Sequence, residues 1–166
     1  MKYWITTDTH FNHWKMLEYC GRPNDFEHKI FKGLSGIPSS DILIHLGDVC
    51  IGRDMEMHNN YIVPLQCKKI LVLGNHDKKS PQWYMTNGWD FALKGLRLKV
   101  SGKRILLTHM PQPDDHWYDI NIHGHFHNSD HRSHEPDLVK VKNEKHKLLA
   151  LEYTNYQPVS LEDFIK

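Results

Sequence analysis

Residues that could bind a metal ion or carry a proton stand at five places in this chain of 166 residues. Each place follows a run of apolar or β-branched residues that predicts a strand. The residues are Asp8, His10, Asp48, Asn75, His76, His109, His125 and His127. Carboxylate, amide and imidazole groups together suit divalent manganese, iron, zinc or nickel, and thiolate ligands are missing from this set. We therefore expect a metal centre without cysteine ligands.

The spacing of two pairs allows both members to face one cavity. Asp8 and His10 are two positions apart, and so are His125 and His127. Side chains two positions apart in an extended chain point the same way. Taken alone, Asp8, Asp48 and His109 are better explained as turn, cap or packed residues, whereas His125 and His127 carry the strongest individual signal. The five places taken together favour metal binding.

The elements that must position these residues follow from the apolar pattern of the first half of the chain. Strands are expected over 3–7, 42–46 and 70–73, and helices over 13–19 (capped by Asn12), 25–34 and 54–66. Alternation of strands and helices favours parallel strands with helices packed on the sheet. In such sheets ligands gather at the carboxyl ends of the strands, where the polar residues stand.

The second half of the chain has a different pattern. Alternation of apolar and charged residues, followed by a turn, predicts a hairpin of strands 96–100 and 104–108. A short strand from Ile120 and a last strand over 148–153 are expected after it. Ser160 and Asp163 predict a capped C-terminal helix. The polar segment 128–147 is expected to form loops near the rim of the site.

Length and composition indicate one globular domain over residues 1–166, with 39% hydrophobic and 25% charged residues. Lys plus Arg (21) and Asp plus Glu (20) nearly cancel, so a nucleic-acid partner is possible but unsupported by charge. The three cysteines are far apart, which favours reduced thiols. No signal peptide and no run of about 18 apolar residues is apparent, so we expect a cytoplasmic protein without a membrane partner. Nothing in the sequence indicates an oligomeric state.

The five places also form an ordered set of short motifs. They read DTH from Asp8, GD from Gly47, GNHD from Gly74, LTHMP around His109 and GHFH from Gly124. In this the sequence resembles the calcineurin-like metallophosphoesterases, whose blocks D-x-H, GD, GNH followed by D or E, a lone His and GHxH stand in the same order. The resemblance implies an α/β fold, a four-layer α/β/β/α sandwich of two mixed β-sheets flanked by helices.

The same resemblance implies two divalent metal ions as cofactors, with manganese expected first and iron, zinc or nickel as alternatives. One ion would be held by Asp8, His10, Asp48 and His127, and the other by Asp48, Asn75, His109 and His125. Asp48 would bridge the ions, which at ~3.5–4 Å apart can share a hydroxide that attacks phosphorus. His76 would act as general acid at the leaving group.

The implied activity is hydrolysis of a small phosphoester or nucleotide, a diester before a monoester because of the GNHD form. A DNA or RNA nuclease is the first alternative, and a non-catalytic metal-binding scaffold for protein partners is the alternative of another class. The segment 49–54 lacks the Asp-Arg-Gly of the protein phosphatases, which argues against that activity. The sequence leaves both structural and functional roles open for Arg53, Asp77, Trp117, Tyr118, His123, His131 and His134.

Overall fold

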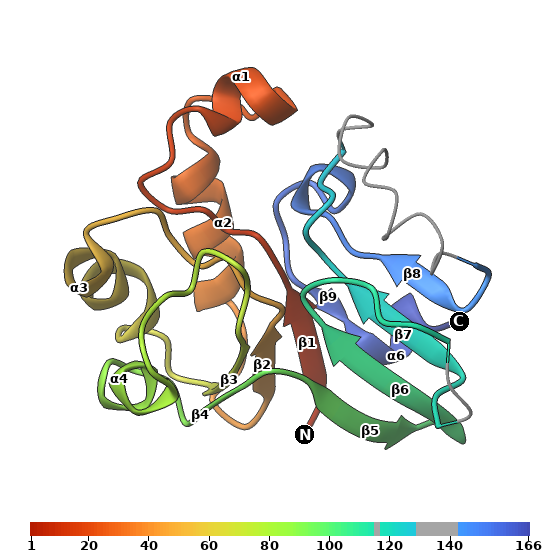
Figure 1. Ribbon diagram of the computed structural model, residues 1–166. Coiled ribbons are helices and arrows are strands. Elements are labelled where there is room, and N and C mark those ends of the chain that lie inside the picture. The colour runs from red at the N-terminus through yellow and green to blue at the C-terminus, as the bar shows by residue number, and fades with distance from the viewer. Residues whose placement is uncertain (115–116, 129–142) are drawn as a thin grey trace.

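The computed structural model describes residues 1–114, 117–128 and 143–166 (Figure 1). A first sheet has the strand order β4-β3-β2-β1-β9. Its strands are β1 (Tyr3–Thr6), β2 (Ile42–His45), β3 (Lys68–Val72), β4 (Phe91–Leu93) and β9 (Val159–Ser160). Strands β1 to β4 are parallel and β9 is antiparallel to β1, so the sheet is mixed.

A second sheet has the order β5-β6-β7-β8. Its strands are β5 (Leu96–Val100), β6 (Lys103–Thr108), β7 (Ile120–His123) and β8 (His146–Leu148). The predicted hairpin forms the antiparallel pair β5–β6, whereas β6–β7 and β7–β8 are parallel. The second sheet is therefore also mixed.

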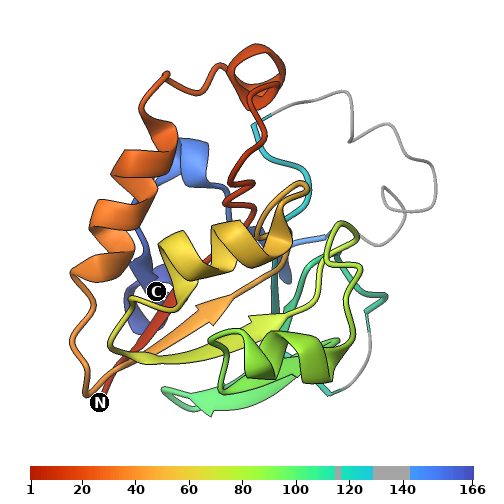
Figure 2. The same cartoon turned by 90° about the vertical axis from the view of Figure 1, so that its left-hand side faces the viewer.

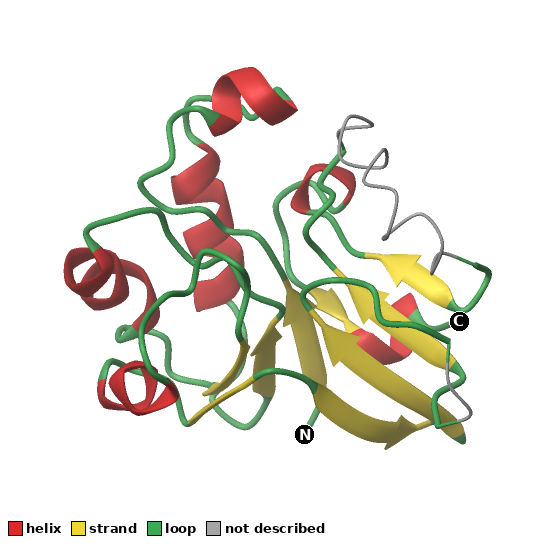
Figure 3. Ribbon diagram, viewed as in Figure 1, coloured by secondary structure: helices red, strands yellow, loops and turns green. Residues whose placement is uncertain are grey.

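Helices cover the outer face of the first sheet (Figures 2 and 3). They are α2 (Phe26–Ser35), α3 (Asp54–Met57), which continues as a π-helical turn, η1 (His58–Ile62), and α4 (Pro81–Thr86). The short helix α1 (Met16–Cys20) lies beyond the end of α2, away from the face of the sheet (Figure 1). A 3-10 turn, η3 (Leu151–Tyr153), and helix α6 (Leu161–Phe164) follow near the C-terminus.

Neighbouring residues of one strand serve two different cores. Leu43 of β2 packs with Phe26 and Ile30 of α2, while Ile44 faces the second sheet and packs with Ile105 and other buried aliphatic residues. Burial of each such side chain contributes about 1.5–3 kcal/mol. The two apolar faces explain why the run 42–46 is continuous rather than alternating. The predicted fold, two mixed sheets flanked by helices, is confirmed.

Two predicted helix boundaries were wrong. Asn12 does not cap the first helix: its φ is 64°, its side chain donates to the carbonyl of Ile51, and the helix begins at Met16 after Lys15. The predicted helix over 54–66 ends at Ile62, before Pro64, whose ring cannot continue a helix. Helix α2 and the C-terminal helix, capped by the Ser160 hydroxyl, are confirmed.

The predicted strand over 148–153 was also wrong. Strand β8 ends at Leu148, and residues 151–153 form the turn η3 instead. Three elements were not predicted from the sequence, α4, β4 and the two-residue β9, because they are short and depend on contacts with the rest of the sheet. Of the predicted loop 128–147, residues 146–147 belong to β8 and residues 129–142 lie outside the described part.

The three cysteines, all among the described residues, form no disulfide and are buried. In the described ranges, no helix combines the length and apolar character required to span a bilayer.

Candidate metal centre

All eight predicted site residues lie in the loops that follow β1, β2, β3, β6 and β7. Backbone hydrogen bonds connect the first two of these loops, from Asp8 N to the Gly47 carbonyl (2.9 Å) and from His10 N to the Asp48 carbonyl (3.1 Å). The His125 amide donates to Asp8 Oδ2 (3.0 Å) and so joins the second sheet to the first. The carboxyl ends of strands from both sheets therefore meet at one site.

Five of the seven predicted ligands have left-handed backbone conformations. The φ angles are 49° to 71° at Asp8, His10, Asp48, His125 and His127. Residues with a Cβ rarely adopt such angles, and each instance costs of order 1–3 kcal/mol. The surrounding fold must hold these angles, and such strain commonly accompanies a functional site.

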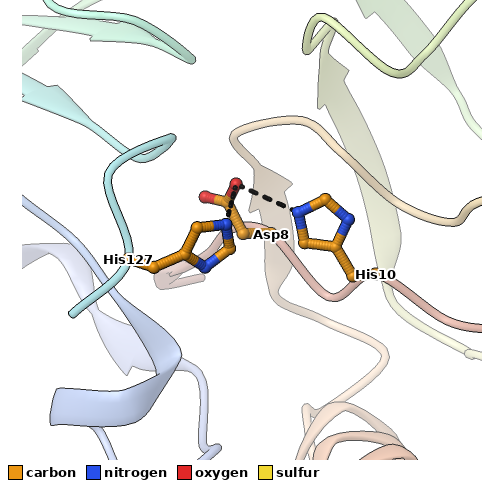
Figure 4. A group of neighbouring side chains, drawn as sticks. All are labelled: Asp8, His10 and His127. Carbon is orange, nitrogen blue, oxygen red and sulfur yellow. Dashed lines mark ion pairs between the residues drawn. The ribbon is translucent and has the colours of Figure 1, made fainter. Parts of the chain in front are cut away.

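Asp8, His10 and His127 form the first group of potential ligands (Figure 4). Asp8 Oδ1 lies 3.6 Å from His10 Nε2 and 3.5 Å from His127 Nε2. All three side chains are buried. The two imidazole nitrogens thus face one carboxylate oxygen, an arrangement that suits a divalent cation.

Asp48, His109 and His125 form the second group, with Asn75 beside it. His109 Nε2 lies 3.4 Å from Asp48 Oδ2, 2.9 Å from Asn75 Oδ1 and 3.2 Å from His125 Nδ1. His109 Nδ1 donates to the Leu46 carbonyl (2.7 Å), because a carbonyl can only accept. A neutral His109 therefore presents a lone pair at Nε2, toward the other three side chains.

Asp48 lies between the two groups. Its Oδ2 is 3.7 Å from His10 Nε2 and 3.4 Å from His109 Nε2. Its Oδ1 accepts the backbone N–H of His76 (2.8 Å), and His76 Nε2 lies 4.0 Å from Oδ2. The His76 side chain is 39% exposed, far more than the imidazoles of the two groups, so it can be reached from solvent.

Two motif glycines are required by close contact with the carboxylates. A methyl group at Gly74 would collide with the Asp48 side chain, and one at Gly124 would collide with Asp8 and the hydroxyl of Thr7. These contacts explain the glycines of GNHD and GHFH, since any larger residue would displace a carboxylate.

The charge state of the site follows from burial and from mutual attraction. Burial opposes ionisation of Asp8, but the nearby His127 and His109 outweigh it and hold the pKa of Asp8 well below its ordinary value. Burial lowers the pKa of His10 to about 4. Burial acts in the same direction on His109, but Asp8 and Asp48 outweigh it and raise its pKa to about 9. A cation that binds Asp48 and His109 must therefore displace a proton.

The donor set fits a pair of divalent cations. Asp8 Oδ1, His10 Nε2, Asp48 Oδ2 and His127 Nε2 are buried and have no hydrogen-bond partner among the described residues. Buried polar atoms are usually hydrogen-bonded, so a cluster of exceptions needs a cause. Cations bound between these atoms would satisfy all four.

Residues outside the motifs support the site. Arg22 is buried and donates to the carbonyls of Asp8 (2.8 Å) and Thr9 (3.0 Å), and its Nε pairs with Glu152 at 2.8 Å. Glu152 Oε1 lies 3.6 Å from His127 Nδ1. Neither residue carried a sequence signal, because each is an ordinary charged residue that only the fold buries.

The Asp77 side chain hydrogen-bonds to the backbone of two loops of the site. Its carboxylate accepts the backbone N–H groups of Asp48 (2.8 Å), Val49 (3.1 Å) and Gly74 (2.8 Å). Asp77 therefore joins the GD loop to the GNHD loop. Burial raises the pKa of Asp77.

The other residues whose roles the sequence left open lie outside the two groups of potential ligands. Tyr118 is buried, and its hydroxyl lies within hydrogen-bond distance of the Gln112 (3.1 Å) and Pro113 (2.9 Å) carbonyls, so its ring is packed inside the protein. The Arg53 side chain is largely exposed, and its Nη1 lies 3.7 Å from Glu56 Oε2. The others are placed as follows: Trp117 lies under the Arg97 guanidinium, buried His123 contacts the Gly124 carbonyl, and His131 and His134 lie outside the described residues.

A cavity of about 360 Å³ opens beside the second group. Asn75 and His109 line it together with the apolar side chains of Leu73 and Met110, and Lys94 contributes a cation. Its volume lies in the range of small-molecule sites, ~300–1,000 Å³.

Comparison with known proteins identifies the family of this chain. The chain belongs to the calcineurin-like phosphoesterase family, whose model matches residues 1–160. The chain is 29% identical over 173 residues to the uncharacterized protein MJ1445 of Methanocaldococcus jannaschii, covering 99% of this chain and 90% of that protein. It is 26% identical over 155 residues to the Gene 66 protein of Mycobacterium phage D29, covering 75% and 77%.

A solved structure, that of the Aquifex aeolicus protein AQ665, whose function is unknown, is similar over nearly the whole chain. The TM-score is 0.78 at 25% identity, and the match covers 99% of this chain and 97% of that one.

Proposed function

We propose that this protein is a dinuclear-metal-dependent phosphoesterase that prefers phosphodiesters. The observation that carries the proposal is the convergence of two groups of buried ligand atoms on one carboxylate oxygen, Asp48 Oδ2, which lies 3.7 Å from His10 and 3.4 Å from His109. Membership of the calcineurin-like phosphoesterase family supports it. Manganese is the first candidate metal, with iron, zinc and nickel as alternatives for the same donors.

The seven ligands divide between two ions. One ion would be bound by Asp8, His10, Asp48 and His127, and the other by Asp48, Asn75, His109 and His125. When bound, the ions would supply a water of lowered pKa and would polarise the phosphoryl oxygens. The protein's part is to hold the donors in place, which the strained backbone and the buried contacts of Asp8 and Asp48 achieve.

His76 would serve as general acid for the leaving group. Its exposed imidazole stands 4.0 Å from Asp48 Oδ2, and its backbone N–H is fixed by Asp48 Oδ1 at 2.8 Å. It can therefore contact a bound ester without giving up a structural bond. His76→Ala should slow hydrolysis of an alkyl ester by about 100- to 10,000-fold and of a nitrophenyl ester much less, because nitrophenolate leaves without a proton.

A small phosphoester or nucleotide fits the site better than a protein substrate. The cavity beside Asn75 and His109 has the volume of a small-molecule site and an apolar wall. Lys94 at its edge can pair with a second anionic group of the substrate. The preference for a diester rests on the GNHD form of the third motif.

A metal-by-substrate screen tests the proposal. Bis-nitrophenyl phosphate, nitrophenyl phosphate and cyclic nucleotides would each be assayed with manganese, nickel, zinc and magnesium. We expect metal-dependent hydrolysis, faster with the diester, that is abolished by Asp48→Asn or His125→Ala and unchanged by the matched control His28→Ala, at an exposed position of α2. Activity that survives both ligand changes contradicts the dinuclear site.

A nuclease is the second candidate, favoured by one observation. A further hollow of about 670 Å³ adjoins the first through Lys94, and Arg97 also lines it, so two cations extend away from the metal centre. If this surface binds phosphates, the double change Lys94→Met and Arg97→Met should weaken cleavage of single-stranded nucleic acid. The same change should leave the hydrolysis of bis-nitrophenyl phosphate as it is. For a non-catalytic scaffold, no metal would produce activity on any of these esters.

A further inference from the structure

A buried carboxylate outside all five motifs lies beside the metal centre. The Glu152 side chain, in η3, is 4% exposed and stands between Arg22 and His127. Its Oε1 is 2.8 Å from Arg22 Nε and 3.6 Å from His127 Nδ1. Burying a carboxylate is costly unless charged or hydrogen-bonding groups compensate, so its position requires an explanation.

His127 has two nitrogens that face different carboxylates. Nε2 lies 3.5 Å from Asp8 Oδ1 in the first group, and Nδ1 lies 3.6 Å from Glu152 Oε1. A neutral imidazole carries one proton, so a ring that offers the Nε2 lone pair to a cation must carry its proton at Nδ1. That proton would then point at Glu152.

Arg22 holds the carboxylate in place from the other side. Its guanidinium pairs with Glu152 and donates to the carbonyls of Asp8 and Thr9, next to two left-handed residues of the first loop. The fully buried guanidinium, 2.8 Å away, fixes the position of the Glu152 carboxylate. Arg22 and Glu152 thus connect the backbone at Asp8 with the ring of His127.

The geometry points to Glu152 as a positioning residue that keeps His127 in the Nδ1–H tautomer, with Nε2 directed at the first metal ion. This inference rests on the proposed function for the identity of the ion. Outer carboxylates that accept from a ligating histidine commonly raise metal affinity by about 10–100-fold.

A different reading is a third cation site. Ligand atoms of Cys20, His127 and Glu152 lie within 4.8 Å of one another. Two contacts argue against it: the Arg22 cation is already 2.8 Å from the Glu152 carboxylate, and His127 would have to bind through both nitrogens.

The test compares Glu152→Gln with Glu152→Asp, Arg22→Met and Cys20→Ser in the full chain. The ¹⁵N chemical shifts of the His127 ring in the metal-free protein report its tautomer, and chelator competition reports zinc and manganese affinity and stoichiometry. For Glu152→Gln we expect a shift toward the Nε2–H tautomer and affinity about 10–100-fold weaker for one of two ions. Glu152→Asp should recover part of the tautomer preference and part of the metal affinity, and Cys20→Ser should change neither the tautomer nor the affinity.

Three outcomes would overturn the inference. The first is an unchanged His127 tautomer in Glu152→Gln that still shows native ¹H–¹⁵N dispersion. The second is a stronger preference for the Nδ1–H tautomer in Glu152→Gln than in the parent. The third is loss of one bound ion in Cys20→Ser. Arg22→Met, which removes the cation that holds the carboxylate, should shift the tautomer in the same direction as Glu152→Gln. The tautomer is measured without metal or substrate, so absence of phosphoesterase activity would refute the proposed function and leave this inference standing.

Discussion

Replacement of Arg22 by Met should destabilise the protein far more than the same change in an exposed ion pair. The Arg22 side chain is completely buried, its Nε is 2.8 Å from Glu152, and it donates two further hydrogen bonds to backbone carbonyls. Arg104 makes an equally short contact with Asp119, 2.7 Å, but the two side chains are 45% and 42% exposed. The two pairs differ in burial and hardly at all in length.

The expected magnitudes follow from burial. Arg22→Met leaves the Glu152 carboxylate buried without its cation, which typically costs about 3–5 kcal/mol. Arg104→Met leaves Asp119 in contact with water, so we expect almost no loss of stability. Since domains of this kind are stable by about 5–15 kcal/mol, the first change should remove a large part of the total and the second almost nothing.

Urea unfolding of the metal-free protein measures both changes. Equal m-values in the variants and the parent would show that the same surface is exposed, so that midpoint shifts report stability. If Arg22→Met does not fold, Arg22→Lys, which retains the charge but not the fork of donors, should fold with an intermediate loss. Equal losses for Arg22→Met and Arg104→Met would refute the argument that burial decides the strength of the pair.

Three further predictions concern the site and its pH dependence. Gly124→Ala should lower the free energy of unfolding by about 1–3 kcal/mol and weaken manganese binding, because the added methyl displaces Asp8. The control Gly36→Ala, whose methyl would meet ordinary contacts at 3.4 Å, should change neither property. Equal effects of the two changes in thermal unfolding would contradict this prediction. Burial lowers the pKa of His45 from 6.5 to about 3. As the pH falls, His45 is therefore protonated in the unfolded chain before it is protonated in the folded protein, and stability is lost between about pH 6.5 and pH 3. His45→Gln should remove ~1.4 kcal/mol per pH unit from that slope in urea titrations, and an unchanged slope would exclude His45 as the cause. Manganese at 100 times its dissociation constant should stabilise the native protein by ~2.7 kcal/mol in thermal unfolding, an effect that a chelator or Asp48→Asn abolishes; stabilisation that persists in Asp48→Asn would place the ion elsewhere.

The order and spacing of short motifs were sufficient to predict which residues the fold brings together at the candidate site. Apolar runs identify strands by composition, and a polar residue directly after a parallel strand must lie at the carboxyl edge of the sheet. The positions of Asp8, Asp48 and His109 could therefore be predicted without any knowledge of contacts. The same local patterns predicted helix α2 and the hairpin β5–β6, since each depends on residues close in sequence.

Other elements depended on their neighbours. Strands β4 and β9 are too short to have a pattern of their own and form because β3 and β1 offer unpaired edges. The segment 151–153 is apolar enough for a strand, but the chain turns there, and Leu151 enters the core under the helices while Glu152 turns toward Arg22.

The sequence by itself determined which chemical groups stand at the strand ends, because residue type and strand period are local properties. Only the tertiary structure decided which groups contact one another and how they are charged. Arg22 and Glu152 are 130 residues apart and are ordinary surface types by composition, yet the fold buries them together beside His127. Burial removes water as a competing partner, and this makes the distance between two charges decisive at the site and unimportant on the surface.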